Sequence, residues 1–187
     1  MSLFEFLMVL VSMIIGLGIA EILTGVARQI RCRGSTHGYW VHSVLVGTIF
    51  VALLQQWWEI WGLRVVPEWS FSGLVMMLSG PVGLFLIAHL LFPEPMHAAN
   101  FKNYYDGDMR PIWWLAALTV ALATLFRPLI IGSNLLSLDN ATSFVFFFGF
   151  VALAISRRSI IHAFLVPFFL LLLILDIFQW SFVIGPG

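Results

Sequence analysis

The sequence predicts an all-α, polytopic membrane protein: a bundle of six transmembrane helices with both termini on the non-cytoplasmic side. Hydrophobic residues make up 61% of the 187 residues and charged residues only 10%, and the mean hydropathy is +1.01. In soluble domains about 25% of the residues are charged, because much of the surface must face water. Six apolar segments also follow one another along the chain. We therefore expect residues 1–187 to form a single integral membrane domain.

The six segments are predicted to be helices. A helix needs about 20 mostly apolar residues to cross the bilayer, and the apolar runs here are continuous, whereas barrel strands alternate. The fifth segment is short, so close packing or local thinning of the bilayer must help it to cross. The expected helices lie at about 3–27, 39–63, 71–92, 111–131, 141–156 and 160–184.

Proline and asparagine residues mark several of the helix limits. Pro93 ends the third helix, since proline cannot continue the hydrogen-bond ladder, and Pro111 suits the first turn of the fourth. Asp139 or Asn140 is placed to cap the fifth helix. Pro81 and Pro167 lie inside the third and sixth helices, where each should produce a kink.

The basic residues indicate the orientation, because loops rich in Lys and Arg stay in the cytoplasm. Two basic residues, Arg64 and Arg127, follow the second and fourth helices. The other seven follow the first, third and fifth helices: Arg28, Arg31, Arg33, Lys102, Arg110, Arg157 and Arg158. This bias places the side that carries the seven basic residues in the cytoplasm and both termini outside.

Three acidic residues are predicted inside the membrane, where an ionisable side chain is costly and suggests a functional site. Glu21 shares a helix face with Gly18 and Gly25, and small residues let a neighbouring helix come close. A packing role is one interpretation of this stripe, and a proton or cation site is the other. The remaining two acids are Glu59 and Asp176.

Glu59 belongs to a set of polar residues at helical spacing. Gln55 lies four residues before it, so the two share a helix face, and Gln56 lies beside that face. Such a ladder either lines an aqueous cavity or joins helices by hydrogen bonds.

Asp176 is followed at three residues by Gln179, and both are expected in the outer half of the membrane with Glu59. Because an unpaired charge at that depth is improbable, we expect Arg127 to be the counter-charge of Asp176 or Glu59.

Histidines give a third group of candidates. His42, His89 and His162 come from different predicted helices at a depth similar to that of Glu21. If they converged, they would form a metal, haem or proton site. No pair of them has the spacing of a known metal-binding motif, so no cofactor is predicted outright.

Several classes of function are excluded. Nine basic residues balance nine acidic ones, which leaves no basic excess for nucleic acid. Lys102 is the only lysine and lies in a loop, whereas a retinal Schiff base needs a lysine in the bundle. Cys32 is the only cysteine, so a paired-cysteine redox motif is missing. The H-E-x-x-H, G-x-S-x-G and potassium-filter motifs are also missing, and no catalytic residue is predicted.

Four short segments carry a resemblance to known sequences. Residues 2–6 and 16–21, followed by Tyr39-Trp40-Val41-His42 and Gln56-Trp57-Trp58, resemble a group of small polytopic bacterial membrane proteins of unassigned function. The resemblance implies a location in the bacterial inner membrane and no particular activity.

Three functions remain as hypotheses. The first is an oligomeric channel or transporter for protons or small ions that uses the intramembrane acids. The second is a non-enzymatic structural or assembly subunit of a larger membrane complex. The third is a redox or pigment protein whose haem or metal is held by histidines. In each case the bilayer is the primary partner.

Overall fold

The computed structural model describes residues 3–65, 69–96, 99–126, 128–129 and 140–180. Within these ranges the named elements are all helical, and no strand is formed. The α-helices are α1 (Leu3–Arg31), α2 (Trp40–Trp61), α3 (Phe71–Leu90), α4 (Phe101–Gly107), α5 (Arg110–Phe126), α6 (Ala141–Ile155) and α7 (Ser159–Trp180), and a 3-10 turn, η1 (Gly62–Val65), follows α2.

Four of the described helices are long and apolar enough to span a membrane: α1, α2, α3 and α7. A fifth span results if α4 and α5, which meet at a bend of 60°, are counted as one broken helix. Helix α6 has 15 residues, or about 22 Å at 1.5 Å per residue, which is less than the apolar thickness of a bilayer. The chain is therefore an integral membrane protein with four to five candidate spans, and the expected six would require α6 to cross as well.

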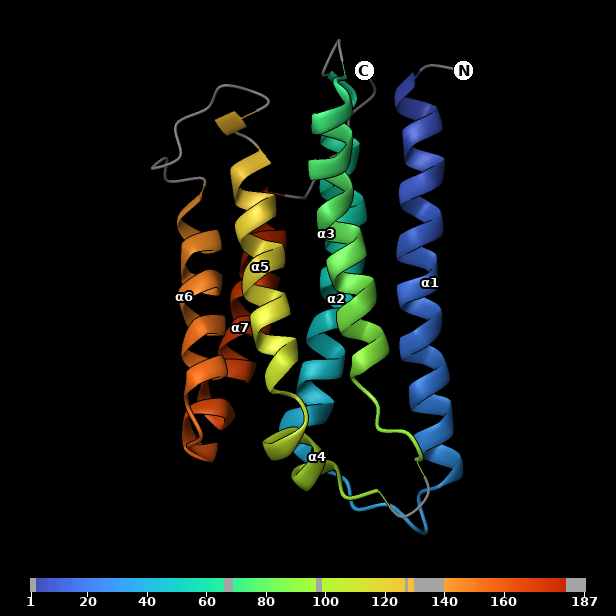
Figure 1. Ribbon diagram of the computed structural model, residues 1–187, viewed down its shortest axis with the longest axis vertical. Helices are drawn as coiled ribbons and strands as arrows, with labels where there is room; N and C mark the ends of the chain where they lie inside the picture. Colours follow the sequence, from blue (N-terminus) through green and yellow to red (C-terminus); the bar gives the residue numbers. More distant parts are fainter. Residues whose placement is uncertain (1–2, 66–68, 97–98, 127, 130–139, 181–187) are drawn as a thin grey trace.

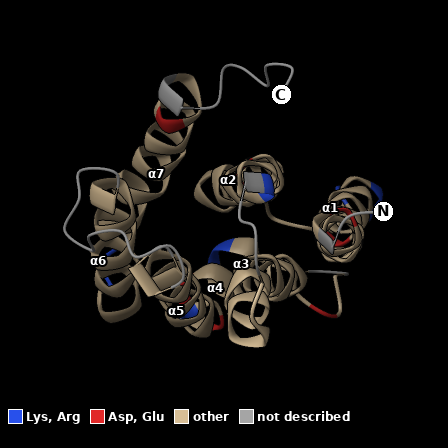
Figure 2. Cartoon of the chain, turned by 90° about the horizontal axis from the view of Figure 1, so that it is seen from above, with Lys and Arg blue, Asp and Glu red and all other residues tan. Residues whose placement is uncertain are grey.

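The long helices stand side by side in one bundle (Figure 1). Seen from above, α1, α3, α5, α6, α7 and α2 follow one another around it (Figure 2), and each packs against the next. The start of α1 and the described end of α7 lie at the same end (Figure 1), which we call the terminal end. The opposite end carries α4 and is called the α4 end.

Two elements differ from the sequence expectation. Helix α1 continues to Arg31, four residues past the predicted limit, with Arg28 and Arg31 in its last turn, where positive charge is favourable against the helix dipole. Helix α4 occupies a segment predicted to be a loop. The Asn100 side chain begins α4 by accepting hydrogen bonds from the backbone N–H groups of Lys102 and Asn103, as an N-cap does.

Close helix contacts depend on glycine at several described positions, and two of them involve α3 or the segment just after it. A Cβ added at Gly83 of α3 would overlap the Thr119 side chain of α5, and one added at Gly25 of α1 would overlap the Phe92 ring just beyond α3. Both glycines are buried. The absence of a side chain therefore lets α3 approach α5 on one side and α1 on the other.

Candidate functional site

A pocket lies at the terminal end of the bundle, between α2, α3 and α5. Its volume is about 100 Å³. Two of its lining residues are polar, and the others are apolar or glycine. The lining consists of Gln56, Glu59, Ile60, Leu63, Met76, Met77, Gly80, Ala123 and Phe126.

Glu59 is positioned by the helical repeat of α2. The Nε2 group of Gln55, one turn earlier, donates a hydrogen bond of 3.0 Å to Oε1 of Glu59. Gln55 is buried, whereas Glu59 is exposed. The predicted shared face of these two residues is thus confirmed, and the buried amide holds the carboxylate at the pocket.

Gln56 lies against α3 at Gly80. A Cβ at Gly80 would lie 3.0 Å from the Gln56 side-chain oxygen, so a larger residue there would press on the amide. Pro81 follows and has no N–H, which deprives the carbonyl of Met77 of its helical hydrogen bond. The Gln56 amide of α2 therefore lies against α3 at the residue just before this proline.

Asp176, the other acid expected near Glu59, is not among the residues that line this pocket. Asp176 is partly buried on α7 and has an interaction partner of its own. Gln179 lies in the last turn of the same helix. Arg127 lies outside the described residues, so its expected pairing with Asp176 or Glu59 stays a prediction.

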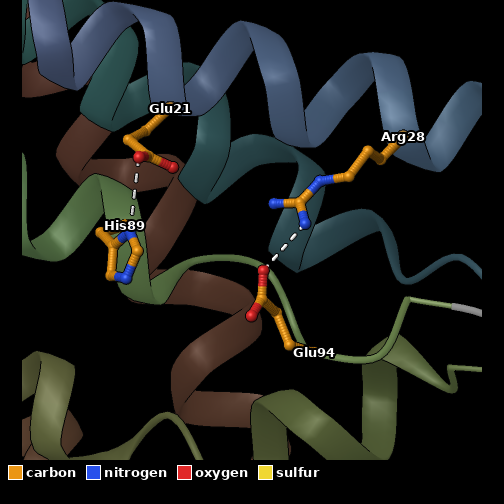
Figure 3. Close-up of polar contacts among 4 residues, drawn as sticks. All are labelled: Glu21, Arg28, His89 and Glu94. Atoms are coloured by element: carbon orange, nitrogen blue, oxygen red, sulfur yellow. Dashed lines mark hydrogen bonds and ion pairs between the residues drawn. The ribbon is translucent and has the colours of Figure 1, made fainter.

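Glu21 faces α3, on the predicted small-residue stripe of α1. Its Oε1 atom lies 3.5 Å from Nδ1 of His89 (Figure 3), and 34% of the Glu21 side chain and 59% of the His89 side chain are exposed. Nearer the α4 end, the Arg28 guanidinium donates a 2.9 Å hydrogen bond to Glu94 in the loop after α3 (Figure 3). That hydrogen bond and the charge of Arg28 hold the pKa of the Glu94 carboxyl below its ordinary value.

His42 is fully buried and has a separate environment. Its Nε2 lies 2.7 Å from the Leu91 carbonyl, to which it must donate because a carbonyl only accepts. The rings of Phe92 and Phe101 pack against the imidazole. His42 thereby ties α2 to the chain that leaves α3.

His162 joins α7 to α4. Its Nε2 donates to the Ser156 carbonyl at 3.1 Å, and its Nδ1 accepts from the Tyr105 hydroxyl at 3.1 Å. The three candidate histidines thus have three different sets of partners. Across the described residues, no group of three or more His, Cys, Asp or Glu side chains is arranged to hold a metal ion.

Sequence reasoning did not identify the apolar walls of the pocket. Met76, Met77, Ala123 and Phe126 belong to ordinary apolar runs, and nothing in their spacing marks them. Tyr105 was missed because α4 was expected to be a loop. Asn100, a residue favoured at N-caps, was the available signal for that helix.

Comparison with known proteins adds no relative to this description. No family model, curated protein or solved structure matches the chain.

Proposed function

We propose that the protein is a small transporter or channel that moves protons or small cations across a membrane, with Glu59 as the group that takes up the ion. One observation carries the proposal: the Glu59 carboxylate borders a pocket at one end of a bundle of membrane-length helices. An acidic side chain in a spanning helix costs a few kcal/mol on insertion scales. A carboxylate placed beside a cavity despite that cost is suited to ion uptake.

The residues around Glu59 support this role. A carboxylate has about four lone-pair positions, so it can take part in more than one interaction besides the Gln55 hydrogen bond. Toward the α4 end, Glu21 and His89 form a second pair able to exchange a proton. We include Asp176 and Gln179 of α7 as further members of the pathway, and Arg127 as their counter-charge.

Proton flux in liposomes tests the proposal. The full chain is reconstituted with a pH-sensitive dye inside, and flux is driven by a potassium diffusion potential. Glu59→Gln removes the charge and the exchangeable proton at nearly constant shape, and should lower the flux at least about tenfold, equivalent to about 1.4 kcal/mol. Glu94→Gln is the control, since Glu94 lies in the loop after α3 and not at the pocket. Absence of wild-type flux, or equal flux in both variants, would refute the proposal.

A second candidate function is that of a structural subunit in a larger membrane complex. It is favoured by α7, where only 17% of the spanning window is buried within the chain, and by α6, which is short for a span on its own. A partner helix could cover both. Mass measurement after extraction in mild detergent should then give a complex of fixed stoichiometry, and a lone monomer of this chain would contradict the idea.

We further propose that the chain lies in the bacterial inner membrane with its α4 end in the cytoplasm, as the basic loop residues favour. Cys32, the only cysteine, is partly exposed just after α1 at that end. A membrane-impermeant maleimide should label it in inverted vesicles and not in intact cells. Ser70→Cys in a Cys32→Ser background, at the start of α3, should show the reverse. Labelling of Cys32 in intact cells would instead show that the α4 end lies outside the cytoplasm.

A further inference from the structure

We propose that the terminal-end pocket takes a small alkylated ammonium ion in preference to an alkali-metal ion. This assignment rests on the proposed function, because it names the class of cation that the same pocket binds. It follows from the composition of the lining, from the aromatic and thioether groups in the walls, and from the volume.

The lining is poorly suited to a bare metal ion. Hard cations in proteins are held by shells of six or more oxygen atoms. Among the lining residues the side-chain oxygens come from Glu59 and Gln56 alone, which is fewer than such a shell needs. A metal ion would lose more hydration than these groups replace.

The same lining suits a cation that carries methyl groups. Such an ion is weakly hydrated at its apolar surface, so the apolar lining can contact its methyl groups, while the exposed Glu59 carboxylate offers the opposite charge. Phe126 is the aromatic residue of the lining, and its ring is stacked on Trp69 with 6.3 Å between centroids. Aromatic faces attract quaternary ammonium groups, and the thioethers of Met76 and Met77 are polarisable and adapt to irregular apolar shapes.

This end of the bundle already holds one cation in that manner. The guanidinium carbon of Arg64 lies 5.8 Å from the centroid of the Trp61 ring, within the range of a cation–π contact. Arg64 and Trp61 flank Leu63, a pocket residue. One cation–π contact within the chain therefore lies beside a pocket residue.

The volume sets the size of the ligand. A cavity of about 150 Å³ accommodates benzene, with six heavy atoms, so the 100 Å³ here corresponds to about four heavy atoms by the same ratio. Trimethylammonium has four heavy atoms, and tetramethylammonium has five. Ala123 is exposed at the rim, where a slightly larger ion could protrude.

Calorimetric titration of the full chain in lipid nanodiscs tests the assignment. The probes are tetramethylammonium chloride, potassium chloride at equal ionic strength, and tert-butanol as a neutral molecule of the same shape. Tetramethylammonium should bind with a Kd of about 1 mM or below, in keeping with the ligand efficiency of very small ligands. Potassium and tert-butanol should each bind at least about tenfold more weakly, a difference of the size of one favourable ionic contact.

Two variants and one control locate the site. Glu59→Gln should weaken tetramethylammonium binding at least about tenfold, and Ala123→Phe should abolish it by filling the rim. Ala123 is exposed, so the larger side chain can be added without disturbing the core, and an unchanged circular dichroism spectrum would verify this. Glu94→Gln should bind the probe as the wild type does.

The outcomes separate this assignment from the proposed function. If tetramethylammonium binds no better than potassium or tert-butanol, or binds equally after Glu59→Gln, the assignment is overturned, while a Glu59-dependent proton flux would leave the transport proposal standing. If tetramethylammonium binding depends on Glu59 but no flux of any cation occurs, the ligand class is supported and the transport proposal falls.

Discussion

Replacing Gly25 with alanine tests how closely α1 packs against the end of α3. Gly25 is buried in α1, and a Cβ at that position would lie 2.5 Å from Cγ of Phe92 and closer still to two other ring carbons. Carbon atoms that are not bonded normally approach to about 3.5–4.0 Å. Phe92 is only 5% exposed, so its ring has little room to swing aside. Either the ring or α1 must move.

The magnitude follows from two opposing effects. Overpacking a core costs about 1–3 kcal/mol, and we expect the upper part of this range because three ring atoms overlap the new Cβ. Alanine in place of glycine inside a helix contributes up to about 1 kcal/mol in the other direction. Gly25→Ala should therefore destabilise the protein by about 1–2 kcal/mol. Gly16→Ala, in the same helix with no atom within 4 Å of the added Cβ, should be neutral or slightly stabilising.

Chemical unfolding of the purified variants in one detergent measures these differences. The Phe92→Ala background provides a second check, because removal of the ring removes the overlap and should return Gly25→Ala to the behaviour of Gly16→Ala. Equal stability of Gly25→Ala and Gly16→Ala in the wild-type background would refute the close packing of α1 against this segment. The close packing would also be refuted if Gly25→Ala lost as much stability in the Phe92→Ala background as in the wild-type background.

Two further predictions concern the α4 end. Arg28 holds the pKa of Glu94 below its ordinary value of 4.5, so the ion pair contributes stability above pH 4.5 and this stability is lost as the pH falls through the lowered pKa. Acidification should therefore lower the thermal midpoint less in Glu94→Gln than in the wild type. An identical decrease in the two proteins would contradict the pairing. Tyr105→Phe leaves the buried Nδ1 of His162 without its donor, which should cost about 1–3 kcal/mol in unfolding measurements. Tyr104→Phe is its control, because that hydroxyl bonds at a more exposed position, and equal costs for the two variants would argue against a buried network.

The helical segments could be predicted because each depends on local composition. A run of about 20 apolar residues has to be helical in lipid so that its backbone groups are bonded within the segment. The shared face of Gln55 and Glu59 followed from the same local geometry, since residues four apart lie one above the other on a helix. The stripe of Gly18, Glu21 and Gly25 was predictable for the same reason, and its glycines lie close to other segments: Gly18 to Leu53 of α2 and Gly25 to the Phe92 ring beyond α3.

Partners across the bundle were not predictable in this way. The sequence placed His42, His89 and His162 at similar depth, but their neighbours depend on how each helix is rotated and shifted along its axis. Small rotations direct one imidazole toward the Leu91 carbonyl, another toward Glu21 and the third into the bundle. Such rotations depend on the sum of many side-chain contacts, which no short pattern records.

The sequence by itself determined that this chain belongs in a membrane, where its main helices run, and which polar residues share a helix face. The tertiary structure alone decided that Glu59 borders a pocket, since the pocket walls come from three helices that are far apart in the sequence. The physical reason is one of range. Hydropathy and helical periodicity act over a few residues, whereas a cavity exists only where the packing of several helices leaves space unfilled.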